Sequence, residues 1–144
     1  MSSGAEKLVL DTSVLISAAI YPQSTAAQAV MLALLTGRVY RSEDTFEELS
    51  SVLTRPKFDR YFVDKVFTRF DFLASFEQVS EIAEVTQTCT DCVDPKDNMF
   101  LSLAVSVGAD CIVFGDKAHL ISMHPYREIH ILSVGDFLLK GQRP

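Results

Sequence analysis

A chain of 144 residues with 48% hydrophobic side chains is long enough to bury one core, which excludes a disordered or linker protein. No apolar run is long enough for a membrane helix and the N-terminus lacks a basic secretory start, so we expect a cytoplasmic protein. The net charge of −6 lacks the basic footprint of most nucleic-acid binders, so such a role would need a local basic stripe. We expect one domain over residues 1–144, with a flexible start over 1–6.

The three cysteines, Cys89, Cys92 and Cys111, are too few for a disulfide framework, and their number is odd. Cys89 and Cys92 form a C-x-x-C pair, which supplies half of the four ligands that a structural zinc ion needs. No second such pair follows, although three histidines occur later in the chain. We interpret the cysteines as incidental thiols rather than as a zinc site.

Strand and helix patterns alternate along the chain. Short apolar runs predict strands at residues 7–10, 39–40, 79–85, 111–114 and 129–132. Helical spacing of apolar residues predicts helices at 14 to about 22, 25–35, 43–53, 58–76, 95–107 and 134–139. This alternation predicts an α/β protein with a mostly parallel sheet.

Local signals mark where several of these helices begin and end. Ser42 is a typical N-cap, and Arg55-Pro56 ends the helix that follows it. Asp94 is a second N-cap, with Pro95 in the first helical position. Gly37 and Gly108 stop the helices before them.

Acidic residues stand where parallel strands end. Asp11 ends the first strand, Asp116 follows strand 111–114, and Asp97 lies in the first turn of the helix before that strand. Each has a structural interpretation: Asp11 as a helix cap, Asp97 as a complement to the helix dipole, and Asp116 as a turn residue. However, ligands of an open parallel sheet bind at the carboxyl ends of its strands. Convergence on that edge favours a shared chemical role.

Helical geometry selects among neighbouring acids. Asp97 lies about 70° from the centre of the apolar stripe on its helix, whereas Asn98 lies nearly opposite that stripe. Glu48 lies about 110° from the apolar centre of its own helix, and Glu47 about 150°. We therefore expect Asp97 to turn inward and Asn98 outward, and Glu48 to point into a cleft, with a plain solvated position as the alternative for Glu48.

Clustered carboxylates need a counter-ion. Two charges ~4 Å apart cost about 4 kcal/mol at an effective dielectric of ~20, so one of them would otherwise take up a proton. Hard oxygen ligands suit Mg²⁺ or Mn²⁺, ions that bind phosphate and lower the pKa of water. The acids therefore favour phosphodiester chemistry with a divalent cation.

Several stretches, in this order and spacing, resemble the PIN domain family and within it the bacterial toxin-like branch. The resemblance covers nearly the whole chain. The most specific stretch runs from Asp94-Pro95-Lys96-Asp97 to Asn98-Met99-Phe100-Leu101. The others are Leu10-Asp11-Thr12-Ser13, Phe46-Glu47-Glu48-Leu49, Val52 to Phe58, Gly108-Ala109-Asp110, Gly115-Asp116-Lys117, His124-Pro125-Tyr126, Ile131-Leu132-Ser133 and Phe137-Leu138.

The resemblance implies a three-layer α/β/α sandwich around a mostly parallel sheet. It implies that Asp11, Glu48, Asp97 and Asp116 match the family's four acids, as catalytic residues and as ligands of Mg²⁺ or Mn²⁺. It further implies cleavage of RNA, a small antitoxin protein that blocks the site, and a homodimer.

Three positions depart from the family pattern. Ser13 stands where the family usually has Asn, but its hydroxyl can still donate a hydrogen bond to the acid pocket. Ala118 stands where a further Asp is common, which puts a second metal ion in doubt. His119 replaces an apolar residue, and we interpret it as facing solvent rather than as a ligand.

Basic residues near the acids are the candidate contacts for substrate. Lys96 and Lys117 each neighbour a predicted pocket acid and could meet a phosphate, as could Arg55; we add Ser13 to this set. The segment 54–62 interleaves basic and aromatic residues, and could hold a nucleic-acid backbone and stack a base. The alternative, favoured for Phe58 and Phe62, is that these rings pack into the core.

Two other functions stay open. A PIN-like chain that lacks the acid at position 118 could bind RNA or protein without cleaving. A receiver or haloacid-type phosphatase also places Asp at strand ends, but the phosphatase needs a second Asp where Ser13 stands, and Lys117 is a poor match to the receiver lysine.

Overall fold

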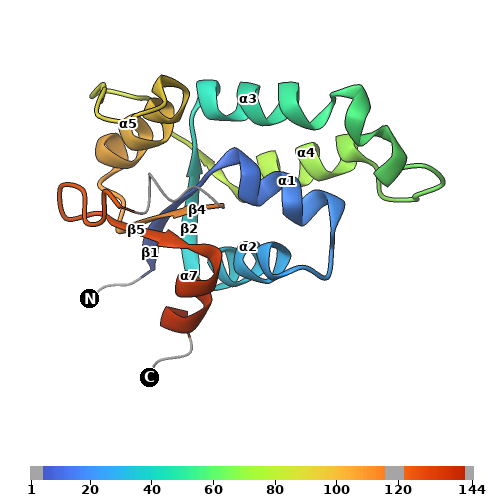
Figure 1. The fold of residues 1–144 in the computed structure, drawn as a ribbon, viewed down its shortest axis with the longest axis horizontal. Helices are drawn as coiled ribbons and strands as arrows, with labels where there is room; N and C mark the ends of the chain where they lie inside the picture. The colour runs from blue at the N-terminus through green and yellow to red at the C-terminus, as the bar shows by residue number, and fades with distance from the viewer. Residues whose placement is uncertain (1–4, 116–121, 142–144) are drawn as a thin grey trace.

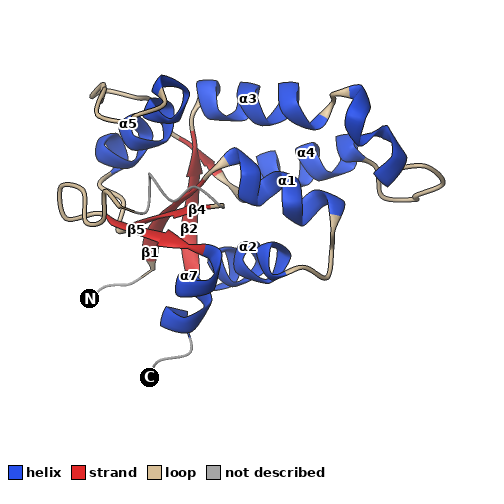
Figure 2. Cartoon of the chain, in the orientation of Figure 1, coloured by secondary structure: helices blue, strands red, loops and turns tan. Residues whose placement is uncertain are grey.

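The computed structural model describes residues 5–115 and 122–141. Its centre is a sheet of five strands: β1 Glu6–Leu10, β2 Gly37–Arg41, β3 Glu81–Ile82, β4 Cys111–Phe114 and β5 His130–Ser133 (Figure 2). The strands lie in the order β3-β2-β1-β4-β5, and every neighbouring pair is parallel. The prediction of an α/β protein with a parallel sheet is confirmed.

Helices connect the strands. The longer ones are α1 Thr12–Ile20, α2 Thr25–Thr36, α3 Glu43–Leu53, α4 Arg69–Val79, α5 Asn98–Val107 and α7 Val134–Gly141 (Figure 1). Two short 3-10 helices, η1 Pro56–Tyr61 and η2 Pro95–Asp97, precede α4 and α5. The predicted caps are present: the Ser42 hydroxyl accepts from Thr45 N–H, and Gly108 ends α5 in the left-handed region at φ 68°.

Side chains alternate between the two faces of β1, as a strand buried on both faces requires. Leu8 and Leu10 join a core formed with α1, α2, α3, α4 and α7. Val9 points the other way, into a second core with Phe100 and Leu103 of α5. The sheet is therefore the middle of three layers, as expected.

The prediction of one helix over 58–76 is wrong. The chain forms η1, turns, and begins α4 only at Arg69, because Thr68 and Asp71 form a capping box. Val66, which the helical spacing placed on the apolar face, is 99% exposed. Phe58 and Phe62 do pack against the first core, as favoured above.

The strand expected over 79–85 is reduced to two residues, Glu81 and Ile82. Both are exposed at the edge of the sheet, so no apolar burial extends the strand. Cys89 and Cys92, just beyond, are buried in the second core with Tyr40 and Phe100. No helix within 5–115 and 122–141 is long and apolar enough to cross a membrane.

Candidate active site at the carboxyl edge of the sheet

The strand order places a crevice between β1 and β4. The chain winds outward from β1 to β2 and β3, then returns to the other side of β1 for β4 and β5. Such a reversal leaves the loops after the two central strands diverging, and this is where open parallel sheets bind ligands. Asp11 directly follows β1, and Gly115 directly follows β4.

Asp11 is fully buried and held from three directions. Its Oδ1 accepts the N–H of Val14 at 3.0 Å, which makes Asp11 the N-cap of α1. The N–H of Gly115 also donates to Oδ1, at 3.3 Å. The Ser13 hydroxyl lies 3.0 Å from both carboxylate oxygens. These donors offset the negative charge and fix the direction of the carboxylate, so the capping interpretation and the chemical one hold together.

Ser13 and Gly115 depend on each other. A Cβ added at Gly115 would lie 2.1 Å from Ser13 Oγ and 3.1 Å from Ser13 Cβ. Only a glycine lets the loop after β4 approach the start of α1 this closely. The close approach brings the backbone N–H of Gly115 within hydrogen-bond distance of the Asp11 carboxylate.

Glu48 is joined to the same place through Thr12. The Thr12 hydroxyl donates to Glu48 Oε1 at 2.5 Å, and Thr12 is the residue after Asp11. Glu48 is half-buried, whereas Glu47 is exposed, in agreement with the helical count. The sequence interpretation missed the role of Thr12. Its position at the start of α1, next to the predicted site acid Asp11, was the available signal.

A cleft joins Glu48 to the predicted phosphate contacts. It encloses about 380 Å³ and is lined by one face of α3 together with Lys96 and Met99. Glu48 lies on that α3 face, and Arg55 just beyond the helix lines the cleft too. The structure therefore brings Glu48, Arg55 and Lys96 together around one hollow.

Asp97 follows Lys96 at the junction of η2 and α5. It is 3% exposed, so the prediction that Asp97 turns inward is confirmed. The expectation that Asn98 turns outward is wrong, because Asn98 is half-buried and its Oδ1 accepts the N–H of Cys92 at 2.9 Å. Asn98 thus holds the end of the loop 89–92, whose residues Cys89 and Cys92 are buried in the second core.

The remaining predicted site residues, Asp116, Lys117, Ala118 and His119, lie outside the described residues. Among residues 5–115 and 122–141, no three His, Cys, Asp or Glu side chains stand close enough to hold one metal ion. The complete four-acid pocket therefore stays a prediction. The chemistry of the donors fits the predicted ion: Asp11, Glu48 and Asp97 are all carboxylates, the ligands that Mg²⁺ and Mn²⁺ prefer.

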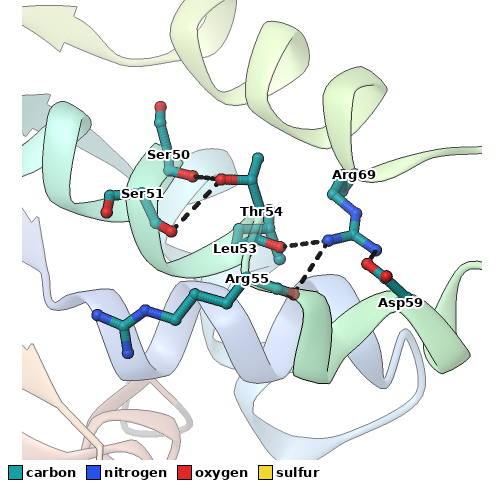
Figure 3. Close-up of polar contacts among 7 residues, drawn as sticks. All are labelled: Ser50, Ser51, Leu53, Thr54, Arg55, Asp59 and Arg69. Atoms are coloured by element: carbon teal, nitrogen blue, oxygen red, sulfur yellow. Dashed lines mark hydrogen bonds and ion pairs between the residues drawn. The ribbon is translucent and has the colours of Figure 1, made fainter.

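Arg69 fixes the end of α3 from which Arg55 reaches the cleft. This guanidinium is buried and donates to the carbonyls of Leu53 and Arg55, at 3.0 and 3.3 Å (Figure 3). It also donates to Asp59 Oδ1 at 2.7 Å. Figure 3 shows the Arg55 side chain extending away from Arg69. Arg69, the first residue of α4, thus links the C-terminus of α3 to η1, a role that the sequence interpretation did not identify.

Comparison with known proteins identifies the family and the fold. Residues 7–118 match the PIN domain family. A solved structure, VapBC2 from Rickettsia felis bound to a DNA fragment from their promoter, contains a similar chain with a TM-score of 0.60 and 15% sequence identity. The match covers 88% of this chain and 98% of that one. No curated protein matches. The family match over residues 7–118 includes Asp11, Glu48, Asp97 and Asp116, and the chain belongs to the PIN domain family.

Proposed function

We propose that the protein is a metal-dependent endoribonuclease and the toxin of a toxin–antitoxin pair. The observation that carries the proposal is that two aspartates, Asp11 directly after β1 and Asp97 directly before α5, are both buried. Buried carboxylates need compensating partners: hydrogen-bond donors hold Asp11, and a divalent cation is a further partner that suits carboxylate oxygens. The membership in the PIN domain family supports nuclease chemistry as the reason.

The protein's own residues would orient the reaction. Asp11 presents a carboxylate whose direction is set by Val14, Ser13 and Gly115. Glu48 is held through Oε1 by Thr12 and borders the cleft. With Asp97, and with Asp116 as the predicted fourth acid, these residues would hold Mg²⁺ or Mn²⁺. When bound, such an ion would polarise the scissile phosphate and lower the pKa of the attacking water.

Lys96 and Arg55 would hold the substrate backbone. Both are exposed and line the cleft beside Glu48. Their positive charges suit phosphates on either side of the scissile bond, in a chain that is otherwise acidic. Lys117, which lies outside the described residues, is a further candidate because it follows Asp116 in the sequence. The proposed substrate is RNA, as in the PIN family resemblance, and the proposed location is the cytoplasm.

A protein partner would need an apolar surface. Between α2 and α7 lies an open groove of about 520 Å³ whose lining includes Met31, Leu35 and Leu138. Met31 is 57% and Leu35 76% exposed, so a partner that binds in this groove would bury apolar surface that is now in contact with water. It supports docking of an antitoxin or a second copy of the chain.

The proposal is tested by incubating the protein with fluorescent RNA and single-stranded DNA oligonucleotides of mixed sequence, in Mg²⁺, in Mn²⁺ and in EDTA. We expect RNA to be cut in the presence of either ion and to stay intact in EDTA. A folded protein that binds these RNAs and cuts none of them under either ion would contradict the nuclease and favour a binding module.

A further inference from the structure

The surface of η1 carries basic and aromatic residues in two rows. Lys57 and Arg60 are three residues apart, and so are Phe58 and Tyr61. A 3-10 helix has three residues per turn, so each pair lies one above the other, about 6 Å apart along the axis. The result is a repeated pair of a cation beside a ring along one side of η1.

Each cation lies over the ring beside it. Lys57 Nζ is 5.1 Å from the centroid of the Phe58 ring, and Arg60 Cζ is 4.8 Å from that of Tyr61. Phe58 packs on the first core and anchors the row. Tyr61 lies farther along the row and meets Tyr21 edge to face, with 5.5 Å between their ring centroids. Tyr21 is 52% exposed, so the outer end of the aromatic row faces solvent.

The Tyr61 hydroxyl is prepared to donate. Its oxygen accepts from the Tyr21 hydroxyl at 3.2 Å and from Arg60 Nη2 at 2.8 Å. These two bonds, that from Tyr21 first, lower the pKa of Tyr61. A phenol oxygen accepts about two hydrogen bonds, so the Tyr61 hydroxyl can form a further hydrogen bond only by donating its own proton. Within the described part of the chain this proton meets no protein acceptor, and an anionic oxygen beside Arg60 would accept it.

The local charge is opposite to that of the whole protein. Residues 55–65 include four basic side chains and two acidic ones, whereas the chain as a whole carries −6. One of the two acids, Asp59, is paired with the buried Arg69. The cations of η1 are thus left to face solvent as a basic stripe.

The stripe is within reach of the acidic site. Asp11 caps the start of α1 and Tyr21 its end, and a helix of nine residues is about 14 Å long. Arg55, which lines the cleft, directly precedes η1. Figure 1 shows the far end of α1 turned toward the same side as the end of α3. At a rise of ~3.4 Å per stacked nucleotide, about four nucleotides cover the length of α1.

We propose that Lys57, Arg60, Tyr61 and Tyr21 form a second contact for single-stranded RNA, about four nucleotides from the acidic site. Arg60 and the Tyr61 hydroxyl bind a phosphate, and a base stacks on the exposed Tyr21 ring, which Tyr61 supports edge to face. This inference rests on the proposed function, because it assumes that the strand held at the acids is RNA.

Binding of a labelled single-stranded RNA octanucleotide to the full-length protein in EDTA tests the contact. Fluorescence anisotropy would be followed over a range of salt concentrations, for Arg60→Ala, Tyr61→Phe and Tyr61→Ala. Lys65→Ala is the matched control, since it removes one exposed positive charge from the same segment but outside the two rows. Circular dichroism would check that each variant folds.

We expect Tyr61→Ala to weaken binding about tenfold or more, in line with loss of a stacked base, and Tyr61→Phe to weaken it several-fold. Arg60→Ala should lower the slope of log affinity against log salt by about 0.7, the amount for one phosphate of a single strand. A purely local structural role for Arg60 would leave that slope at the value of Lys65→Ala.

Two outcomes would overturn the proposal. If all three variants bind the octanucleotide as Lys65→Ala does, the surface is not an RNA contact, even if the protein cleaves RNA. If they bind RNA unchanged but lose affinity for a protein antitoxin, the surface belongs to that partner. Conversely, weakened RNA binding in a protein that cuts no RNA would refute the proposed nuclease and leave the contact standing.

Discussion

Replacing Asp11 in two ways separates its structural role from its chemical one. Asp11→Ala removes the cap of α1, which costs about 0.5–2 kcal/mol, and leaves the buried N–H groups of Val14 and Gly115 without their acceptor. We expect a total loss of about 2–4 kcal/mol in the free energy of unfolding.

Asp11→Asn should cost less than about 1 kcal/mol. Both backbone N–H groups donate to Oδ1, so an amide oxygen in that place accepts them equally well. The amide nitrogen then faces the Ser13 hydroxyl, which can rotate to accept rather than donate. The fold is kept, and only the negative charge is lost.

Urea unfolding followed by far-ultraviolet circular dichroism, in EDTA and in Mg²⁺, measures both effects. Mg²⁺ should stabilise the natural protein in proportion to its binding and should leave Asp11→Asn nearly unchanged, because a ligand that binds only the folded state adds stability. If Asp11→Asn were as unstable as Asp11→Ala, the capping geometry would be refuted. If Mg²⁺ stabilised Asp11→Asn as much as the natural protein, Asp11 would not be a metal ligand.

Three further predictions concern the surroundings of the site. Gly115→Ala should cost about 1–3 kcal/mol and lower cleavage, because its Cβ displaces the Ser13 hydroxyl from Asp11; adding Ser13→Ala should recover part of the lost stability, because only the Cβ contact at 3.1 Å then stays, but not cleavage, in urea and RNA assays. Arg69→Met should cost about 2–3 kcal/mol in urea unfolding, since it removes the donors to the end of α3, whereas Asp59→Asn on the exposed side of that ion pair should cost under about 1. Burial raises the pKa of the Cys111 thiol to about 12, so iodoacetamide at pH 8 should label Cys111 only in unfolded protein, as read by mass spectrometry; labelling in native protein would contradict the buried position.

Much of the fold could be predicted from local sequence signals. Ser42 and Gly108 set helix ends through bonds within a few residues, so the sequence alone locates them. The prediction of one helix over 58–76 was wrong because the helical spacing continues across Thr68, where a capping box starts a new helix. Asn98 was misplaced because its partner, the backbone of Cys92, lies in an irregular loop that no periodicity describes.

The sequence located candidate acids at the ends of strands and helices, but it did not reveal the contacts that hold them. The alignment of Asp11 and Asp97 with strand and helix ends follows from the α/β pattern, and both are buried as expected. The bond from Thr12 to Glu48 and the contact of Gly115 with Ser13 join residues that are far apart in the sequence. Such contacts depend on how the helices pack on the sheet, so composition and spacing do not reveal them.

The central claim is that Asp97 belongs to a metal-dependent hydrolytic site. The most direct test is to compare RNA cleavage in Mn²⁺ by the natural protein and by Asp97→Asn, purified identically so that any contaminating nuclease is common to both. We predict metal-dependent cleavage by the natural protein and its loss in Asp97→Asn at unchanged fold. Equal cleavage by the two proteins would contradict the account.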